Sequence, residues 1–455
     1  MSINSILNTG VKGMVSTQLA TSVTASNISN AATVGYTRRT TNIDPDQALR
    51  NNGGGSRVVE PFIQKRLLSA QSSAGEAQAQ NAAVAVLDNV FSEGDGSIGS
   101  ALDQFQVAIQ NLTASPDDTA SRQAVLANAA NLSTAFQNAN AQIEQARQDS
   151  TLRVEQGLAA VNSRLDQIGK LGVQIQQAEL AGSEASDMRD QRDVLVKEVA
   201  NYIPVTLLDQ GNGQVSLMLG GAHQIVSPDG QVGALSARVG DDGGLRIQKV
   251  VAGATVDVTG QVNGGSIGGE LKARSGALTD VQKKLDQLAY DTASAYNSVH
   301  RAGVGLDGST GRALFDEQAT VAGSAGAFAV SSDVAGAPQN IAAALETTSL
   351  PSDNRGAIAL ANISTAPLAL GGMTVTEALA SLVGYAGTTV QAAQQQEAFT
   401  TGALQQVEAL HDSASGVNSD EEMVSLMKYQ RAYQASLKVI SVADQMLSEL
   451  LNIRG

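Results

Sequence analysis

The chain has 455 residues, enough for two to four domains that each bury a core of their own. Its formal net charge of −15 argues against nucleic acid as a partner, because few cations would be available to neutralise phosphates. It contains no cysteine, which excludes disulfides, thiolate nucleophiles and thiolate metal sites.

The start of the chain does not resemble a secretory leader. Residues 1–14, MSINSILNTGVKGM, lack the apolar region and the small-residue cleavage site of a signal peptide. No apolar run approaches the roughly 18 residues that a membrane span needs. We therefore expect either a cytoplasmic protein or export by a route that uses no cleaved leader.

Residues 3–30 are predicted to form one helix. A stripe of large and small side chains keeps heptad spacing along it, namely Leu7, Gly10, Met14, Thr17, Thr21, Thr24 and Ile28. So thin a stripe is too weak to hold a helix by itself in water. Gly35 is predicted to stop the helical region, and residues 44–55, rich in Asn and Gly, to form an irregular connector.

Residues 62–201 are predicted to be mostly helical, with a break at residues 92–97. The sequence Ser-Pro-Asp-Asp predicts a new helix start, with Ser115 as the N-cap and Pro116 as the first helical residue. Leu, Val and Ile keep heptad spacing over residues 158–175, which favours a coiled-coil-like pair or a bundle.

The pattern changes at Pro204. Residues 202–268 alternate apolar with polar side chains and carry Gly, Asn and Asp at turn positions, so they are predicted to form a small β domain. Helix is predicted to return over residues 270–300. The Gly-rich residues 301–350 are predicted to be irregular or β.

A long helical region is predicted to follow Thr374, which has the capping-box spacing to Glu377. A break at residues 413–418 separates it from the last helix, which carries the strongest periodic signal of the chain. The apolar positions of this helix share one heptad frame: Met423, Leu426, Tyr433, Leu437, Ile440, Leu447 and Leu451.

These patterns predict a mainly α fold with an inserted β domain, in which the N- and C-terminal helices pair as a coiled coil. The predicted parts are a terminal-helix polymerisation domain (1–44 plus 416–455), a helical bundle (45–201 plus 269–300 plus 351–415), a small β insert (202–268) and a Gly-rich β or irregular segment (301–350). Because the terminal stripes lie beyond breaks in the chain, we expect them to pair with each other and with copies in neighbouring subunits.

No arrangement of residues predicts catalysis, a cofactor or a metal. The histidines His223, His300 and His411 lie in different predicted segments and lack metal-ligand spacing. The LDGSTG sequence at residues 306–311 is predicted to be a β-turn, because the bidentate Glu of a calcium loop is missing. The run DMRDQRD, residues 187–193, is predicted to form solvated i,i+4 pairs on a helix. We do not expect an enzyme.

Both ends of the chain resemble bacterial flagellar axial proteins, which form the rod, the hook and the hook-associated structures. SNISNAATVGYTRR, residues 26–39, resembles their Asn-Ile-Ala-Asn…Pro-Gly-Tyr-Ser/Thr-Arg phrase, with Val34 where that phrase usually has Pro. Residues 415–453 are similar to the closing segment of the same proteins.

Three internal stretches narrow the resemblance to the hook-associated protein 1 family, which forms the hook–filament junction. They are residues 101–136, 187–199 and 305–316. The resemblance implies a structural protein that leaves the cell through the flagellar type III export channel without a cleaved signal peptide. It also implies an axial ring that contacts the hook protein and hook-associated protein 3, and a cytoplasmic export chaperone at the C-terminal region.

Under this hypothesis, the terminal segments form the subunit interface. Asn27 and Asn30 supply side-chain hydrogen bonds at a helix end, Gly35 turns the chain, and Tyr36 anchors the interface. The other expected polymerisation residues are Leu7, Met14 and Ile28 together with the seven apolar positions of the last helix.

Three alternatives stay open. A hook or distal-rod protein has the same kind of ends, and the long helical middle argues against it because the hook protein is largely β between its ends. An exported adhesin or binding module would act through the β insert at residues 202–268. An enzyme such as a glycan hydrolase would need a convergent catalytic constellation, and none is evident in the sequence.

Overall fold

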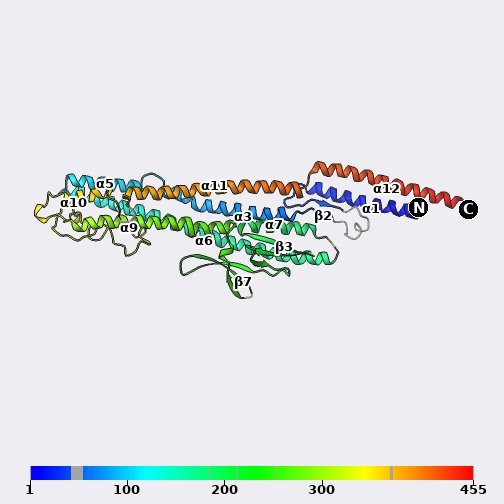
Figure 1. Cartoon of the computed structure of the whole chain (residues 1–455), viewed down its shortest axis with the longest axis horizontal. Helices are drawn as coiled ribbons and strands as arrows, with labels where there is room; N and C mark the ends of the chain where they lie inside the picture. Colours follow the sequence, from blue (N-terminus) through cyan, green and yellow to red (C-terminus); the bar gives the residue numbers. More distant parts are fainter. Residues whose placement is uncertain are drawn as a thin grey trace. The chain divides into compact units, whose positions relative to one another are not determined.

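The computed structural model describes residues 2–41, 55–182, 184–211, 213–251, 253–368 and 372–453 (Figure 1). It divides into two compact units: unit 1 comprises residues 1–77, 154–269 and 398–455, and unit 2 comprises residues 78–153 and 270–397. The four-part division drawn from the sequence follows secondary structure instead, and it stays a prediction. Most of the predicted connector, residues 44–54, lies outside the described residues.

The protein is mainly α-helical, as predicted. The helices are α1 (Ile3–Asn30), α3 (Pro61–Val84), α4 (Val86–Val90), α5 (Ile98–Ala114), α6 (Thr119–Leu180), α7 (Ser186–Tyr202), α8 (Gly265–Lys272), α9 (Leu278–Ala302), α10 (Arg355–Ala361), α11 (Val375–Ser415) and α12 (Ser419–Ile453). The strands are β1 (Arg39–Thr40), β2 (Ser56–Arg57), β3 (Val205–Gly211), β4 (Gln214–Leu219), β5 (His223–Val226), β6 (Ala234–Val239), β7 (Leu245–Val251) and β8 (Ala254–Asp257).

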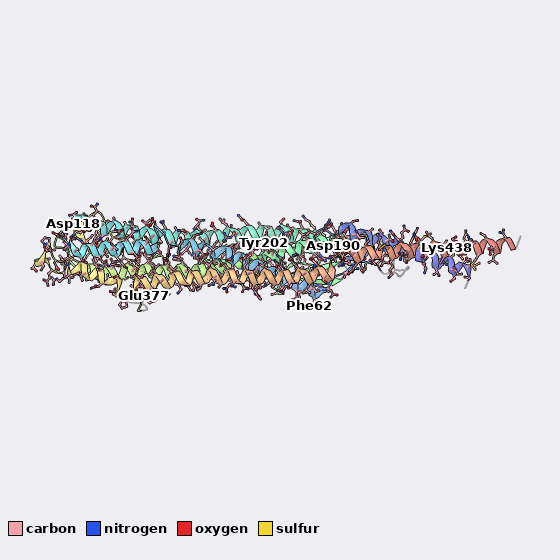
Figure 2. All side chains as sticks on the ribbon, turned by 90° about the horizontal axis from the view of Figure 1, so that it is seen from above. Phe62, Asp118, Asp190, Tyr202, Glu377 and Lys438 are labelled. Atoms are coloured by element: carbon pink, nitrogen blue, oxygen red, sulfur yellow. The ribbon has the colours of Figure 1, made fainter. Side chains whose placement is uncertain are left out.

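Side-chain caps set the starts of the long helices. The predicted capping box of α11 is confirmed, because the Glu377 carboxylate accepts the Thr374 backbone N–H at 2.8 Å and the Thr374 hydroxyl accepts the Glu377 N–H. The predicted start at Ser115 and Pro116 is wrong. Helix α6 begins at Thr119, and the Asp118 carboxylate is its cap, accepting the Ser121 N–H at 2.8 Å. Figure 2 labels Asp118 and Glu377.

In unit 1, the strands predicted between residues 202 and 268 are confirmed. They form two antiparallel three-stranded sheets, β3-β4-β5 and β6-β7-β8, while β1 and β2 pair separately. The apolar heptad positions of α6, Leu158, Val161, Leu165, Ile168 and Ile175, are all buried. Asn162 on α6 ties the edge strand β6 to the helix, because its side chain exchanges two hydrogen bonds with the Leu235 backbone at 2.7 and 2.8 Å.

In unit 2, one apolar core joins residues of α5, α6, α9, α10 and α11. Its centre is a cluster of aromatic rings. The ring centroid of Phe105 lies 5.1 Å from that of Tyr296 and 5.7 Å from that of Phe315, and both pairs meet edge to face. Phe315 belongs to the Gly-rich segment, which is mostly turns with isolated bridges at Val304–Ala344 and Phe315–Val330. The segment therefore contributes to the core although it has little regular structure.

Buried polar side chains hold this irregular segment on the helices. Asn297 accepts the backbone N–H groups of Leu314 and Phe315, both at 2.9 Å, and donates to the Phe315 carbonyl. Arg122 is fully buried and donates to the carbonyls of Pro116 and Ile341 at 2.7 Å. These contacts satisfy backbone groups that no sheet or helix pairs, which explains why the segment is ordered without regular structure.

His300 makes a pH-dependent contact of the same kind. Its Nδ1–H donates to the Arg312 carbonyl at 2.8 Å, and its Nε2 accepts the Ala342 N–H at 3.0 Å, so the buried ring is neutral. Burial lowers the pKa of His300 below its ordinary value, although the bond to Arg312 works in the opposite direction.

Acid should therefore destabilise the protein through His300. The imidazole of His300 takes up a proton near pH 6.5 in the unfolded chain and only at lower pH in the folded chain. The free energy of unfolding is therefore unaffected by the titration of His300 above about pH 7. Below that pH it falls by at most about 1.4 kcal/mol per pH unit. We expect the unfolding free energy of the wild type to fall relative to that of His300→Gln between pH 7.5 and 5.5. Denaturant titrations at each pH measure this, and a constant difference would contradict it.

Candidate functional site at the terminal segments

Helices α1 and α12 lie side by side and run antiparallel (Figure 1), which confirms the predicted pairing of the terminal helices. The contact is very close, because a Cβ added to Gly10 would lie 2.8 Å from Ile440 Cγ1 and one added to Gly13 would lie 2.9 Å from Ser436 Oγ. The buried residues of α1 are mostly small: Gly10, Ser16, Thr17, Ala20, Val23, Thr24 and Asn27. Small side chains let the two backbones approach.

Most of the larger apolar residues of the predicted stripes are not fully buried, although Ile440 meets Gly10 in the close contact. Leu7, Met14 and Ile28 of α1 are only partly buried. On α12, Leu426, Tyr433 and Ile440 are partly buried, whereas Met423, Leu437 and Leu447 are exposed by 50%, 42% and 39%. Leu451 lies in α12, and its side chain is outside the described part of the structure. The close α1–α12 contact is therefore made mainly by the small positions.

A further apolar surface lies along α12. Val439, Val442 and Met446, at intervals of three and four residues, share one helix face and are exposed by 41%, 43% and 46%. We call these three residues the α12 apolar face. Val424, Met427 and Leu450 of the same helix are also exposed. This much exposed apolar surface on one helix is typical of an interaction site.

Asn27 is the polar centre where the two terminal segments meet. It is 1% exposed and uses both side-chain atoms. Its Nδ2 donates to the Arg39 carbonyl at 2.8 Å and to Glu422 Oε2 at 3.1 Å. Its Oδ1 accepts the Tyr36 hydroxyl at 2.9 Å and the Arg39 N–H at 3.1 Å. Asn27 therefore joins the end of α1, the following segment and the start of α12.

Glu422 is the second member of this centre, and sequence reasoning missed it. It is 3% exposed in the first turn of α12, and its Oε1 accepts the Arg38 Nε–H at 2.8 Å. The Arg38 backbone N–H also donates to the Ser415 carbonyl at 2.8 Å. No spacing in the sequence could reveal the contact between Asn27 and Glu422, because 395 positions separate them.

The other predicted residues of the N-terminal phrase have different environments. Asn30 stays local, donating from Nδ2 to the Ser26 carbonyl at 2.9 Å. Gly35 has a φ of +81°, and a Cβ added there would lie 2.2 Å from Val194 Cγ2 of α7. The Tyr36 ring lies 4.9 Å from the Arg39 guanidinium. The structure thus brings Asn27 and Tyr36 together and leaves Asn30 outside the Asn27–Glu422 centre.

The acidic run on α7 does not form the solvated i,i+4 pairs predicted for it. Its carboxylates Asp187, Asp190 and Asp193, three residues apart, face two arginines from the β1–β2 pair. Arg39 binds Asp187 and Asp190, and Arg57 binds Asp190 at 2.8 Å and Asp193 at 2.5 Å. Burial disfavours the charged form of the Arg39 guanidinium. Its hydrogen bonds to Asp187 and Asp190 outweigh this effect and raise the pKa of Arg39 above the ordinary value.

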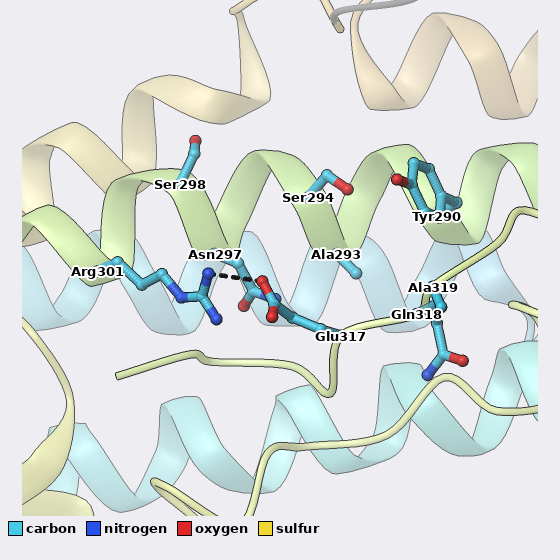
Figure 3. Close-up of a pocket in the computed structure, with 9 residues that line it drawn as sticks. All are labelled: Tyr290, Ala293, Ser294, Asn297, Ser298, Arg301, Glu317, Gln318 and Ala319. Carbon is cyan, nitrogen blue, oxygen red and sulfur yellow. Dashed lines mark ion pairs between the residues drawn. The ribbon is translucent and has the colours of Figure 1, made fainter. Parts of the chain in front are cut away.

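A groove of about 540 Å³ runs along α9 (Figure 3). Its lining includes Tyr290, Ser294 and Ser298 of α9. Its two charged side chains, Arg301 and Glu317, neutralise each other at 2.6 Å. Across the described ranges, no group of three His, Asp or Glu side chains is placed to hold a metal ion. None of the described helices contains an apolar stretch that could span a bilayer.

Known proteins match nearly the whole chain. Residues 84–315 match the family described as the helical domain of flagellar hook-associated protein FlgK. Residues 7–37 match the flagella basal body rod protein family, and residues 411–453 match the C-terminal family of the basal body rod FlgEFG proteins.

Individual relatives agree with these families. Flagellar hook-associated protein 1 of Bacillus subtilis is 26% identical over 99% of this chain and 98% of the relative. The protein of the same name from Salmonella typhimurium is 24% identical over 99% of this chain and 100% of the relative. The structure of the flagellar hook junction protein FlgK from Burkholderia pseudomallei has a similar fold, with a TM-score of 0.69 and 17% identity over 77% of this chain and 100% of that one.

Proposed function

Because this chain belongs to the family of flagellar hook-associated protein FlgK, its role is structural, at the hook–filament junction, and we propose that it performs this role as an axial ring of identical copies. In the ring, α1 and α12 form the contacts between subunits. The match of residues 84–315 to the FlgK helical domain favours this role over that of a hook or distal-rod protein.

The α12 apolar face is the observation that supports the ring most strongly. Within one chain, α1 covers the small positions of α12 and leaves Val439, Val442 and Met446 exposed. On another side of the same helix, Met423 and Leu437 are exposed as well. Helix α12 thus has exposed apolar side chains on both sides of its contact with α1, and a neighbouring copy can pack against each side. Burial of these side chains would supply the driving force for assembly of the ring.

Further partners follow from the position of the ring. We propose that it contacts the hook protein and hook-associated protein 3, and that an export chaperone covers the exposed apolar residues of α12 before export. Export then proceeds through the flagellar type III channel. The proposed role includes no catalysis.

A strain that lacks this gene tests the proposal. We expect hooks of normal length without attached filaments, and flagellin released as monomer into the medium, because the filament has no junction on which to start. Electron microscopy of the cells and immunoblots of the medium measure both effects, and expression of the intact chain should restore filaments. Normal filaments in the deletion strain would overturn the proposal.

A further inference from the structure

Helix α11 has an exposed surface almost without charge. Over residues 378–407 the only charged side chain is Glu397, whose Oε2 accepts the Asn81 Nδ2–H of α3 at 2.5 Å. The other long helix is different. Over residues 144–179, α6 carries Glu144, Arg147, Asp149, Arg153, Glu155, Arg164, Asp166, Lys170 and Glu179. Apart from one glutamate, α11 is therefore uncharged over about eight helical turns, in a chain with a net charge of −15.

An exposed phenylalanine lies on the part of this surface that belongs to unit 1. Phe399 is 72% exposed, and Leu410, three turns later on the same side of the helix, is 49% exposed. Between them lie Gly402, Ala403 and Gln406, and a Cβ added to Gly402 would meet nothing within 4 Å. We call these five residues the α11 face.

The composition of the α11 face is that of a protein interface. A helix side that stays in water usually carries charged residues, and the α11 face has none. Interface centres are depleted of Lys, Glu and Asp and enriched in aromatic residues, which supply much of the binding energy. Phe399 among small and uncharged neighbours fits this description. We therefore expect the face to be covered by another protein surface.

Charge and position indicate that this surface belongs to a second copy of the chain. Two copies that each carry a charge of −15 repel one another over most of their surfaces. The uncharged α11 face lets them come into contact without placing like charges together, whereas it offers a cationic partner no attraction. Only residues 416–418 separate α11 from α12, so copies held side by side through α12 in the ring are also close at the end of α11.

The available area explains why such a contact needs the ring. Helix α11 has 41 residues and is therefore about 60 Å long. A strip about 10 Å wide along its whole length gives roughly 600 Å², below the approximately 800 Å² per partner of a typical stable interface. The α11 face alone is smaller still. It cannot hold two free monomers together, but it can add to a contact between copies that are already held side by side.

We infer that the α11 face packs against a neighbouring copy of this chain in the ring, with Phe399 as its apolar anchor. This contact is separate from the one that the terminal helices make. The inference rests on the proposed function, because the face is too small to join copies in solution.

A photo-crosslinker on the α11 face tests the inference in assembled flagella. The variant Phe399→p-benzoylphenylalanine of the full-length chain is expressed in the deletion strain, and flagella with their hooks are isolated and irradiated. The benzophenone group forms a covalent bond with the surface that it contacts. Immunoblots against this chain detect the crosslinked product, and peptide mass spectrometry identifies both of its components.

We expect a product that contains two copies of this chain and that does not form when the purified monomer is irradiated. Adding Gly402→Asp should lower its yield at least about fivefold, because the new carboxylate enters open space in the single chain and faces a neighbouring copy in the ring. Gly172→Asp is the matched control, since an added Cβ on α6 also meets nothing within 4 Å. It should leave the yield unchanged. The crosslinker at Leu152, which is 53% exposed on the charged surface of α6, should give no such product.

Two results would overturn the inference. One is a crosslink from position 399 to another protein, such as the hook protein, and none to a second copy. The other is the absence of any product in flagella that contain the variant. If the variant at Phe399 does not enter flagella, the crosslinker at Leu410 of the same face replaces it, with the same expected result. Absence of the wild-type chain from isolated hooks and flagella would instead remove the proposed function, and the inference with it.

Discussion

Replacing Gly35 by alanine should lower the free energy of unfolding of unit 1 by about 3 kcal/mol. The left-handed φ of +81° disfavours any side chain at this position, and the new Cβ would overlap Val194 Cγ2 of α7 at 2.2 Å. The substitution should therefore displace the Tyr36–Arg39 segment from α7 and disturb the Asn27–Glu422 centre. Chemical denaturation followed by circular dichroism measures the loss of stability.

A second variant separates the two causes. Adding Val194→Ala to Gly35→Ala removes the overlap but leaves the unfavourable φ, so it should recover part of the loss. Gly172→Ala is the matched control, because Gly172 lies inside α6 and an added Cβ would meet nothing within 4 Å. There alanine should stabilise the helix by about 0.5–1 kcal/mol. Equal stability of Gly35→Ala and the wild type would contradict this account.

Local signals in the sequence were sufficient to predict the helices and some of their ends. Heptad spacing predicted α1 and α12, and the Thr374–Glu377 spacing predicted the cap of α11. The start of α6 was predicted at Ser115, because Pro is favoured in the first helical turn. In the structure Arg122 binds the Pro116 carbonyl, and the Asp118 carboxylate, three residues after Ser115, caps the helix.

The candidate site was only partly predictable, because its contacts join distant parts of the chain. The sequence predicted one apolar seam along α12. In the structure Ile440 meets Gly10 of α1, whereas Met423 and Leu437 are exposed. Periodicity shows which residues share a helix face and not which side the partner occupies. The contact between Asn27 and Glu422 depends on the fold alone.

The spacing of the aspartates in α7 indicates in the sequence that they need cationic partners from outside the helix. Asp187, Asp190 and Asp193 recur every three residues and so lie along one face of a helix. Three like charges on one face are unfavourable unless cations approach them from outside the helix. The tandem Arg38 and Arg39 of the N-terminal phrase were candidates for this role. Arg39 binds Asp187 and Asp190, and Arg57 of β2 binds Asp190 and Asp193.

The second large effect is expected on the α12 apolar face. The triple variant Val439→Asp, Val442→Asp and Met446→Asp places charges on exposed positions beside Lys438, which is labelled in Figure 2. Because none of the three positions is buried in the single chain, the monomer should remain folded and α1 and α12 should stay paired. In a ring, by contrast, three unpaired carboxylates would be buried between copies, and assembly should be lost.

The matched control is Ser441→Asp, Gln445→Asp and Ser448→Asp, which adds the same charge at exposed polar positions of α12. The most direct measurement counts hooks that carry filaments, by electron microscopy, in a deletion strain expressing either variant. We predict that the variant of the apolar face lowers this count at least about tenfold and that the control restores wild-type filaments. Wild-type filaments on cells expressing the apolar-face variant would contradict assembly through the terminal helices.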